Sequence, residues 1–396
     1  ACASSCPRNC ITMQYDEEGF LYPVIDKDLC VNCGICDKVC PFGHLKDRVV
    51  ANRSIYMAFQ NSNQNVRMDS TAGGAFSLIA EYIINNGGIV YAVGYNAEMI
   101  VCHEKCDSSR GLNKLRGSKY VQSDLKNIFV DIKSNIEERI VLFVGTPCQV
   151  HGLKAFIGDN KNLYTIDLLC LGVSSPKLFA EWIEYMNDKY HSQVRHVSFR
   201  DKHYGYATPN VRVFFKNGKS MDQKYDTRVH ANLFFRHYNV RPSCYECLFR
   251  EVPRVSDFTI GDFNEIGSIN KKMDDDKGTT KVWIHTGRGK ELFRALEASA
   301  VYYILDESSS NIIGGPKKQI KIPDKREDFF IDASKMSYPD LISKWQPRNI
   351  KGELAGILRP IINILPFKTR IFKYLRKKKI NNYEKNVRDL NSKKDE

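Results

Sequence analysis

The middle of the chain alternates between helix-like and strand-like patterns of apolar residues. Apolar side chains recur with helical spacing over residues 72–87, which end at a glycine, and over 176–190, which begin with a proline. Three short apolar runs are typical of buried strands, at residues 88–95, 139–148 and 162–172. An Asn-Gly pair between alternating residues predicts a hairpin in 211–220. This mixture predicts an α+β (mixed α/β) fold.

The two ends of the chain differ from this middle. Residues 1–46 have few long apolar segments and cannot bury much core, and 47–66 form a polar connector with some β content. Beyond about Trp345, two prolines interrupt an apolar stretch, and the basic string KTRIFKYLRKKKI follows. We therefore expect three parts: a small ferredoxin-like unit over 1–46, a larger mixed-sheet domain over 65–345, and a basic amphipathic tail over 346–396.

Composition and charge narrow the class of protein. With 396 residues, 42% of them hydrophobic and 27% charged, the chain is not globally disordered. No apolar run reaches the roughly 18 residues of a membrane-spanning helix. Of the net charge of +13, +8 lies after residue 350, where thirteen Lys/Arg face five Asp/Glu. The tail could lie on an anionic membrane, with a solvated, partly disordered end as the alternative. Nucleic acid is not an expected partner, since nothing outside the tail supports it.

Cysteine use indicates metal ligation rather than disulfides. Seven of the thirteen cysteines lie in the first 40 residues, the total is odd, and no signal segment is present at the start. Secreted disulfide frameworks normally show the opposite features. We therefore expect a cytoplasmic protein, with peripheral contact to the inner face of the membrane left open.

The strongest motif is Cys30-x-x-Cys33-x-x-Cys36-x-x-x-Cys40-Pro41. Two-residue gaps let one tight loop supply three thiolates to a [4Fe-4S] cluster, and the cysteine before proline serves the other cluster in two-cluster ferredoxins. The alternative is a structural zinc knuckle.

Cys2-x-x-x-Cys6-Pro7 matches the end of a second copy of this motif. Crossed pairing then gives one cluster Cys30, Cys33, Cys36 and Cys6. The other cluster takes Cys2, Cys40 and two residues that we expect upstream of Ala1, so that the natural chain would begin earlier. Cys10 falls outside the spacing, and we interpret it as a buried small residue.

Three segments of the larger domain carry candidate chemistry. In VRMDSTAGGAFS, hydroxyls and an arginine precede a Gly-Gly pair and a helix, which is a pattern that can bind an anion. Taken alone, the pattern favours an ordinary capped helix, and the anion site needs support from other motifs. RGSKYVQS, residues 116–123, could hold a pyrophosphate or a flavin edge, or be a solvated loop. Thiols follow two buried strands, where α/β sheets bind ligands, and a Cys-x-x-Cys lies on a later loop. The candidate thiols are Cys148, Cys170, Cys244 and Cys247; unrelated buried cysteines are the alternative.

Together these strings resemble the family of coenzyme F420 hydrogenase/dehydrogenase beta subunits. The markers are STAGGAF, LRGSKYVQS, LFVGTPCQVHGLK, DLLCLGVSSP, SFRDKHYGY, RPSCYECLF and TIGDF. The resemblance implies bound FAD, iron–sulfur clusters and transfer between one- and two-electron carriers. It implies FAD contacts at Arg67, Ser70, Thr71, Gly73, Gly74, Ser118, Lys119 and Thr146. It also implies a third cluster on the four thiols of the larger domain. The family often has Trp-Gly after Gly-Asp-Phe, where this chain has Asn264-Glu265.

We therefore expect an iron–sulfur flavoprotein oxidoreductase that passes electrons between ferredoxin-type clusters and FAD to reduce or oxidise an organic substrate or coenzyme. Its electron partner would be a ferredoxin or a reduced coenzyme. The two ferredoxin motifs and the basic tail resemble members encoded among surface-polysaccharide genes. The alternatives are a non-catalytic electron-delivery subunit bound to a protein partner and a flavin-less scaffold for a glycan-assembly enzyme. No catalytic acid is assigned, because surface or core roles are favoured for His103, His151 and His203.

Overall fold

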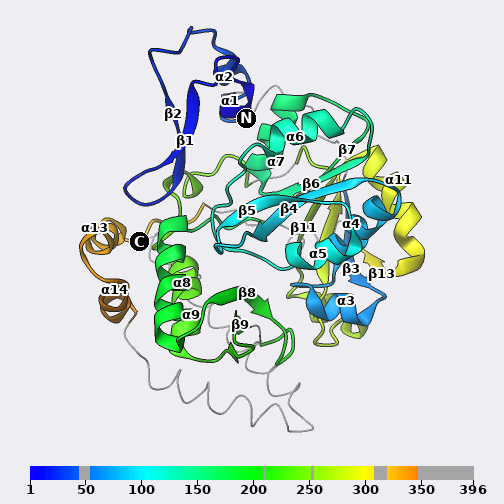
Figure 1. The fold of residues 1–396 in the computed structure, drawn as a ribbon. Helices are drawn as coiled ribbons and strands as arrows, with labels where there is room; N and C mark the ends of the chain where they lie inside the picture. The colour runs from blue at the N-terminus through cyan, green and yellow to red at the C-terminus, as the bar shows by residue number, and fades with distance from the viewer. Residues whose placement is uncertain (44–53, 209, 251–253, 307–318, 347–396) are drawn as a thin grey trace, which may run out of the picture.

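The computed structural model describes residues 1–43, 54–208, 210–250, 254–306 and 319–346. Within these ranges a small cysteine-rich unit lies at one end of a larger body that contains two further sheets (Figure 1). The mixed α/β class predicted from the apolar patterns is confirmed. The tail expected over 346–396 lies, apart from its first residue, outside the described residues.

An eight-stranded mixed sheet forms the centre of the larger body, in the order β13-β3-β12-β11-β7-β6-β4-β5. The pairs β4–β6, β6–β7 and β7–β11 are parallel, and the remaining pairs are antiparallel. The strands are β3 (Ile55–Asn61), β4 (Ile89–Tyr95), β5 (Val101–Cys106), β6 (Val141–Gly145), β7 (Leu163–Leu168), β11 (Phe258–Asp262), β12 (Thr280–Ile284) and β13 (Ala300–Ile304). The predicted buried strands at 88–95, 139–148 and 162–172 become β4, β6 and β7.

Helices cover both faces of this sheet. Apolar side chains of α4 (Ala75–Asn85), α5 (Ser109–Leu115) and α11 (Gly287–Leu296) share one buried cluster with one face. Those of α6 (Ile128–Asn135) and α7 (Pro147–Ile157) share another with the opposite face. The apolar runs in the strands are continuous because both faces are buried.

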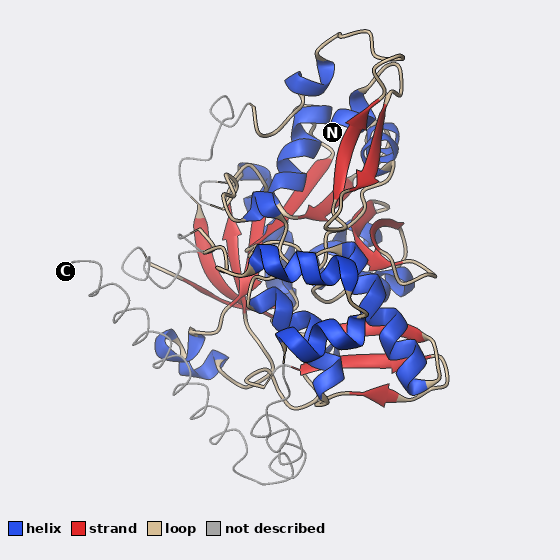
Figure 2. Ribbon diagram, turned by 90° about the vertical axis from the view of Figure 1, so that its left-hand side faces the viewer, coloured by secondary structure: helices blue, strands red, loops and turns tan. Residues whose placement is uncertain are grey.

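A second lobe packs beside the sheet (Figure 2). Its three-stranded sheet has the order β10-β9-β8 and shares a core with two long helices. The elements are β8 (Val194–Asp201), β9 (Asn210–Phe215), β10 (Ser220–Met221), α8 (Pro176–Tyr190), α9 (Tyr225–Phe235), α13 (Arg326–Lys335) and α14 (Tyr338–Trp345). The predicted hairpin is the β9–β10 pair, and the predicted helix over 176–190 is α8.

Short elements complete the described chain. They are α3 (Gln64–Asp69), α10 (Ile266–Ile269) and single 3-10 turns at Pro242–Cys244, Lys271–Met273 and Glu297–Ser299. β3 pairs with both β12 and β13, so it belongs to the large sheet although it precedes residue 65, the expected start of that domain. Among the described helices, none is long and apolar enough to cross a bilayer.

The cysteine-rich unit contains α1 (Cys2–Ser5), α2 (Ile35–Lys38) and the antiparallel hairpin of β1 (Ile11–Tyr15) with β2 (Leu21–Ile25). The tip of this hairpin is inserted into the larger body. Phe20 is fully buried, and its ring centroid lies 6.4 Å from that of Phe330 on α13.

Polar contacts fix the same hairpin tip. The Gln122 side chain accepts from the backbone N–H of Leu21 at 2.8 Å and donates to its carbonyl at 3.1 Å. Arg326 on α13 binds the Glu18 carboxylate, with Nη1 to Oε1 at 2.7 Å. The Ser175 hydroxyl donates to the Glu18 carbonyl at 2.6 Å. The unit is therefore held at a fixed place on the larger body.

Phe20→Ala should lower the free energy of unfolding by about 3–5 kcal/mol, because it removes a fully buried ring between two parts of the molecule. Urea denaturation measures this change. Met13→Ala on the same hairpin is the matched control: Met13 is 44% exposed, and we expect a change within about 0.5 kcal/mol. Equal effects of the two variants would contradict the docking described above.

Candidate functional site

Four thiols gather at the edge of the large sheet where its parallel strands end. Cys148 lies in the first turn of α7, directly after β6, with its Sγ 3.2 Å from Thr146 Oγ1. The backbone N–H of Thr146 donates to Gln149 Oε1 at 2.9 Å, which fixes this turn. Cys170 follows β7, the parallel neighbour of β6. Both strands therefore deliver a thiol to the same edge.

The loop with Cys244 and Cys247 is tied to the chain that follows Cys170. The backbone N–H of Arg241 donates to the carbonyl of Val173 at 3.0 Å. Gly172 has a φ of +121°, and a Cβ built on it would lie 2.9 Å from Val240 Cγ1 and 3.3 Å from Cys244 Cβ. The two loops approach so closely that only glycine fits there.

The pKa directions show that these thiols lie together. Burial raises the pKa of Cys170, and the neighbouring Cys244, Cys148 and Cys247 raise it further. Burial, with Cys148 and Cys247 nearby, raises the pKa of Cys244 to about 12. Burial also raises the pKa of Cys148. Four thiolates here would need positive charge beside them, as a bound metal group supplies.

The four thiols and their surroundings are chemically compatible with an iron–sulfur cluster. In the part of the chain that the structure describes, no three His, Cys, Asp or Glu side chains converge closely enough to hold one metal ion. The Nε of Arg241 is buried without a hydrogen-bond partner among the described residues. A cluster is wider than an ion, and its sulfurs accept hydrogen bonds. The donor set and the orphaned N–H therefore suit it.

In the small unit several of the motif cysteines lie near one another. Cys6 Sγ lies 3.3 Å from Cys10 Sγ, and the hydrogen bond between these two thiols, together with burial and the nearby Cys30, raises the pKa of Cys10 to about 12. Cys2 and Cys40 both lie near the N-terminal amine, since both raise its pKa against the larger effect of burial. Cys6 therefore lies near Cys30, whereas Cys2 lies near Cys40 and also near Cys36. Cys10 is buried, as interpreted from the sequence.

The end of the unit with Cys2 and Cys40 faces α7. Ala1 packs against the core beneath α6 and α7. The Phe42 ring centroid lies 5.1 Å from that of Phe249, which in turn lies 4.9 Å from the ring of His151 on α7. The helix that begins at Cys148 therefore contacts this end of the small unit.

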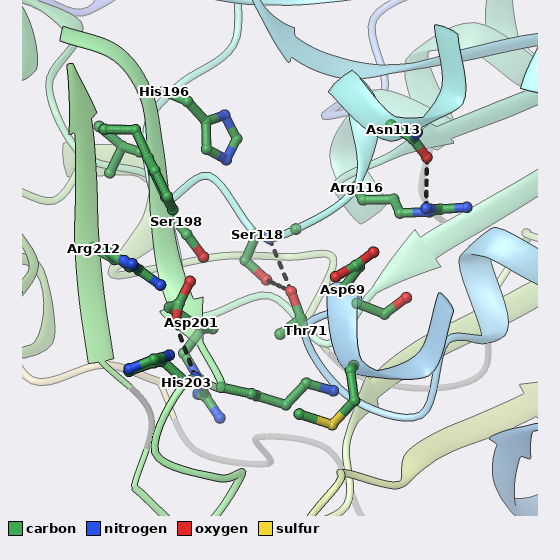
Figure 3. Close-up of a pocket in the computed structure, with 17 residues that line it drawn as sticks. Asp69, Thr71, Asn113, Arg116, Ser118, His196, Ser198, Asp201, His203 and Arg212 are labelled. Atoms are coloured by element: carbon green, nitrogen blue, oxygen red, sulfur yellow. Dashed lines mark hydrogen bonds between the residues drawn. The ribbon is translucent and has the colours of Figure 1, made fainter. Parts of the chain in front are cut away.

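A cavity of about 560 Å³ lies between the small three-stranded sheet and the segments at the ends of α3 and α5 (Figure 3). Its lining includes three of the predicted FAD contacts, Ser70, Thr71 and Ser118. Thr71 Oγ1 accepts from the Ser118 backbone N–H at 3.0 Å, and the two hydroxyls lie 3.2 Å apart. A cavity of this size suits a small organic ligand or part of a larger cofactor.

Basic residues surround the cavity, and most of them lie on β8 or β9 or directly after β8. Arg212 on β9 donates to Ser220 Oγ at 2.9 Å, whereas Arg200 on β8 pairs with Asp262 at 2.9 Å. Arg116 pairs with Glu81 at 2.8 Å. The remaining ionisable lining residues are Asp69, His196, Asp201, Lys202 and His203. The excess of cations favours an anionic ligand.

Five predicted FAD contacts do not line this cavity. Arg67 is 1% exposed and binds Asp275, with Nη1 to Oδ2 at 2.8 Å. Gly73 lies so close to the Phe59 carbonyl that a Cβ would clash, and Gly74 starts α4 with a φ of +85°. Lys119 donates to the carbonyl of Arg116 at 2.9 Å, and burial lowers its pKa to about 7. Thr146 lies beside Cys148.

The three histidines considered from sequence take different places. His103 is buried with its Nε2 3.1 Å from the Val144 carbonyl, and burial lowers its pKa to about 4. His151 is buried on α7, whereas His203 lines the cavity. Sequence reasoning named the string SFRDKHYGY only as a marker, so it assigned no site role to Arg200 or Lys202. Arg212 carried no sequence signal at all.

One segment connects the cavity, the small unit and the thiol edge. Ser118 lines the cavity, and Gln122 holds the hairpin of the small unit. The next residue, Ser123, accepts from Gln149 Nε2 on α7 at 2.9 Å. Residues 117–123 therefore fix these three features relative to one another.

Comparison with known proteins adds independent findings. Residues 138–309 match the family described as the C terminus of the coenzyme F420 hydrogenase/dehydrogenase beta subunit, and residues 1–44 match a 4Fe-4S dicluster domain. Over 256 residues the chain is 25% identical to an F(420)H(2) dehydrogenase subunit of Methanosarcina mazei. That match covers 58% of this chain and 64% of the relative, which is less than two thirds of its length. A chain from a xenon-derivatised F420-reducing NiFe hydrogenase complex of Methanosarcina barkeri aligns with a TM-score of 0.45 and 15% identity, over 76% of this chain and 94% of that one.

Asp275→Asn should lower the free energy of unfolding by about 2 kcal/mol, because it leaves the buried Arg67 guanidinium without its counter-charge. Urea denaturation measures the change. Asp324→Asn is the control, since Asp324 and its partner Lys321 are each 89% exposed, and we expect no more than about 0.5 kcal/mol. If Asp275→Asn left the free energy of unfolding unchanged, Arg67 would be free to bind an anion.

Proposed function

Because residues 138–309 match the C terminus of the coenzyme F420 hydrogenase/dehydrogenase beta subunit family and residues 1–44 match a 4Fe-4S dicluster domain, we propose that the chain is an iron–sulfur flavoprotein oxidoreductase. Single electrons pass between the ferredoxin-type clusters, a third cluster on Cys148, Cys170, Cys244 and Cys247, and FAD at the basic cavity. The flavin then reduces or oxidises an organic substrate or coenzyme. The resemblance of the two ferredoxin motifs and the basic tail supports a substrate from surface-polysaccharide synthesis.

The observation that carries this proposal is the order of the three features in space. The Cys2 and Cys40 end of the small unit contacts α7, and Cys148 lies in the first turn of α7. Residues 117–123 connect this region to the cavity. Electron carriers placed in this order would form one continuous route.

The residues of the cavity have clear roles in this scheme. FAD supplies the ability to store two electrons and to pass a hydride. The arginines on β8 and β9 that line the cavity would hold its phosphates, since guanidinium groups bind phosphate oxygens. The hydroxyls of Thr71 and Ser118 face each other in the wall and would orient a polar ring edge. His203 is the histidine of the three that lies where a proton could be exchanged with a ligand.

A second candidate is an electron-delivery subunit of a larger complex. The Methanosarcina mazei relative is itself named as a subunit. The strand β13, at one end of the sheet order, leaves Val301 and Ile304 51% and 59% exposed, and exposed apolar edge strands favour pairing with another chain. Turnover by the isolated chain with a low-potential donor would favour the enzyme, and activity only with a partner would favour the subunit.

The full natural chain, purified without oxygen, should contain about twelve irons and one FAD, because three four-iron clusters are expected. Iron, acid-labile sulfide and extractable flavin per chain are the measurements. Cys170→Ser should lose about four irons, whereas the control Cys102→Ser should lose none, since Cys102 is a buried cysteine outside the thiol group. About eight irons in the unaltered chain would exclude the third cluster. Iron without flavin, even after incubation with FAD, would exclude the oxidoreductase and favour the scaffold.

Arg212→Gln should weaken FAD binding by at least about tenfold, because it removes a cation that lines the cavity and forms no ion pair with a carboxylate of the described residues. Quenching of flavin fluorescence on titration into cluster-loaded, flavin-free protein measures the affinity. Arg195→Gln is the control: Arg195 lies on the neighbouring strand β8 but not in the cavity wall. Equal affinities in both variants would place FAD elsewhere.

A further inference from the structure

Arg241 lies between the small unit and the thiol group of the larger body. Its guanidinium carbon is 4.0 Å from the centroid of the Tyr22 ring, on strand β2 of the hairpin. Its backbone N–H donates to the Val173 carbonyl, in the loop that follows Cys170. Three residues later the chain reaches Cys244. One side chain therefore contacts the hairpin while its backbone belongs to the thiol loops.

The guanidinium has an unmet hydrogen-bonding capacity. Its Nε is buried and lacks a partner among the described residues, although a planar guanidinium normally directs its N–H groups at acceptors. The guanidinium also lies close enough to Cys148 and Cys244 for its positive charge to act on both side chains. Negative charge on the thiol group would therefore be stabilised by this cation.

We propose that Arg241 is a positioning residue that couples the ferredoxin unit to the third cluster, by stacking on Tyr22 and directing its charge and Nε–H at the cluster thiolates. This inference rests on the proposed function, because it requires the cluster on Cys148, Cys170, Cys244 and Cys247. Stacking fixes the plane of the guanidinium, which lysine could not reproduce.

The step that Arg241 favours is the transfer of one electron. A ferredoxin-type cluster is oxidised, the cluster on the four thiols is reduced, and no bond forms or breaks. The added negative charge arises beside the guanidinium, so the cation favours the reduced form. Hydrogen bonds to cluster sulfurs and local charge are among the factors that set the potential of such clusters. Arg241 therefore makes transfer toward the larger body more favourable.

The test is redox titration of the anaerobically purified full chain, with the clusters followed by electron paramagnetic resonance. Arg241→Gln should lower the midpoint potential of the third cluster. We expect the equilibrium constant for its reduction by the ferredoxin clusters to fall about tenfold, which corresponds to a shift of 59 mV for a one-electron couple. Arg294→Gln removes an exposed charge from α11 and serves as the matched control. It should leave the potential unchanged.

Two further variants separate charge from stacking. Arg241→Lys keeps the charge and should restore most of the potential but not the rate of transfer between the units. Tyr22→Ala should slow that transfer, measured by stopped-flow reduction, whereas Tyr22→Phe keeps a ring under the guanidinium and should behave as the unaltered chain does.

The outcomes separate this inference from the proposed function. If the unaltered chain holds about eight irons, the proposed function fails at its third cluster. If it holds about twelve and Arg241→Gln keeps them with an unchanged potential, the role of Arg241 alone is overturned. Loss of four irons in Arg241→Gln would be a structural effect, and the transfer rate of Arg241→Lys then decides: a rate equal to that of the unaltered chain would contradict the proposal.

Discussion

The parallel pairing of β6 with β7 is the constraint on which the arrangement of the site depends. The two strands are in register from Val141 opposite Leu163 to Gly145 opposite Asp167, so they end at the same edge of the sheet. Their side chains are almost entirely buried, and a shift of register would move apolar side chains to the wrong face. The residues after each strand are therefore delivered to one place, and they include Cys148 and Cys170.

The loop with the other two thiols cannot be placed by the strands alone. It is brought in by backbone contacts with the chain after β7 and by the close approach at Gly172. The same neighbourhood receives the hairpin of the small unit, through Gln122 and Arg326. The small unit has too little apolar core to hold itself in place, so it depends on contacts contributed by the larger body. Electron transfer between the two would depend on the same contacts.

The sequence predicted the elements and cysteines that rest on local pattern. Continuous apolar runs predicted β4, β6 and β7 because burial on both faces leaves a signal within a few residues. The Cys-x-x-Cys spacing is likewise a local signal, because all residues of the motif lie in one tight loop. The strand β3 was missed as part of the sheet because its partners, β12 and β13, lie more than 200 residues away and its flanks are polar. Arg67 looked like a free anion-binding group because its partner Asp275 is equally remote.

Two lysines show why residue type alone does not identify a ligand contact. Lys119 donates to the carbonyls of Leu115 and Arg116, at the end of α5. Lys202, on the far side of the cavity, donates to the carbonyls of Ala72 and Lys277. Burial lowers the pKa of each to about 7. Each ammonium thus satisfies carbonyl groups that have no helical or sheet partner.

The consequence concerns the shape of the cavity. The loops that carry Thr71 and Ser118 are each fixed by one of these lysines, and the two hydroxyls meet between them. The lysines therefore do not bind a ligand directly. They bind backbone carbonyls of the two loops and so fix the positions of the cavity walls. Arg212 on β9 lines the space that remains and forms no ion pair with a carboxylate of the described residues. A wall fixed before binding costs little reorganisation when an anionic cofactor enters, which is the condition for tight and oriented binding.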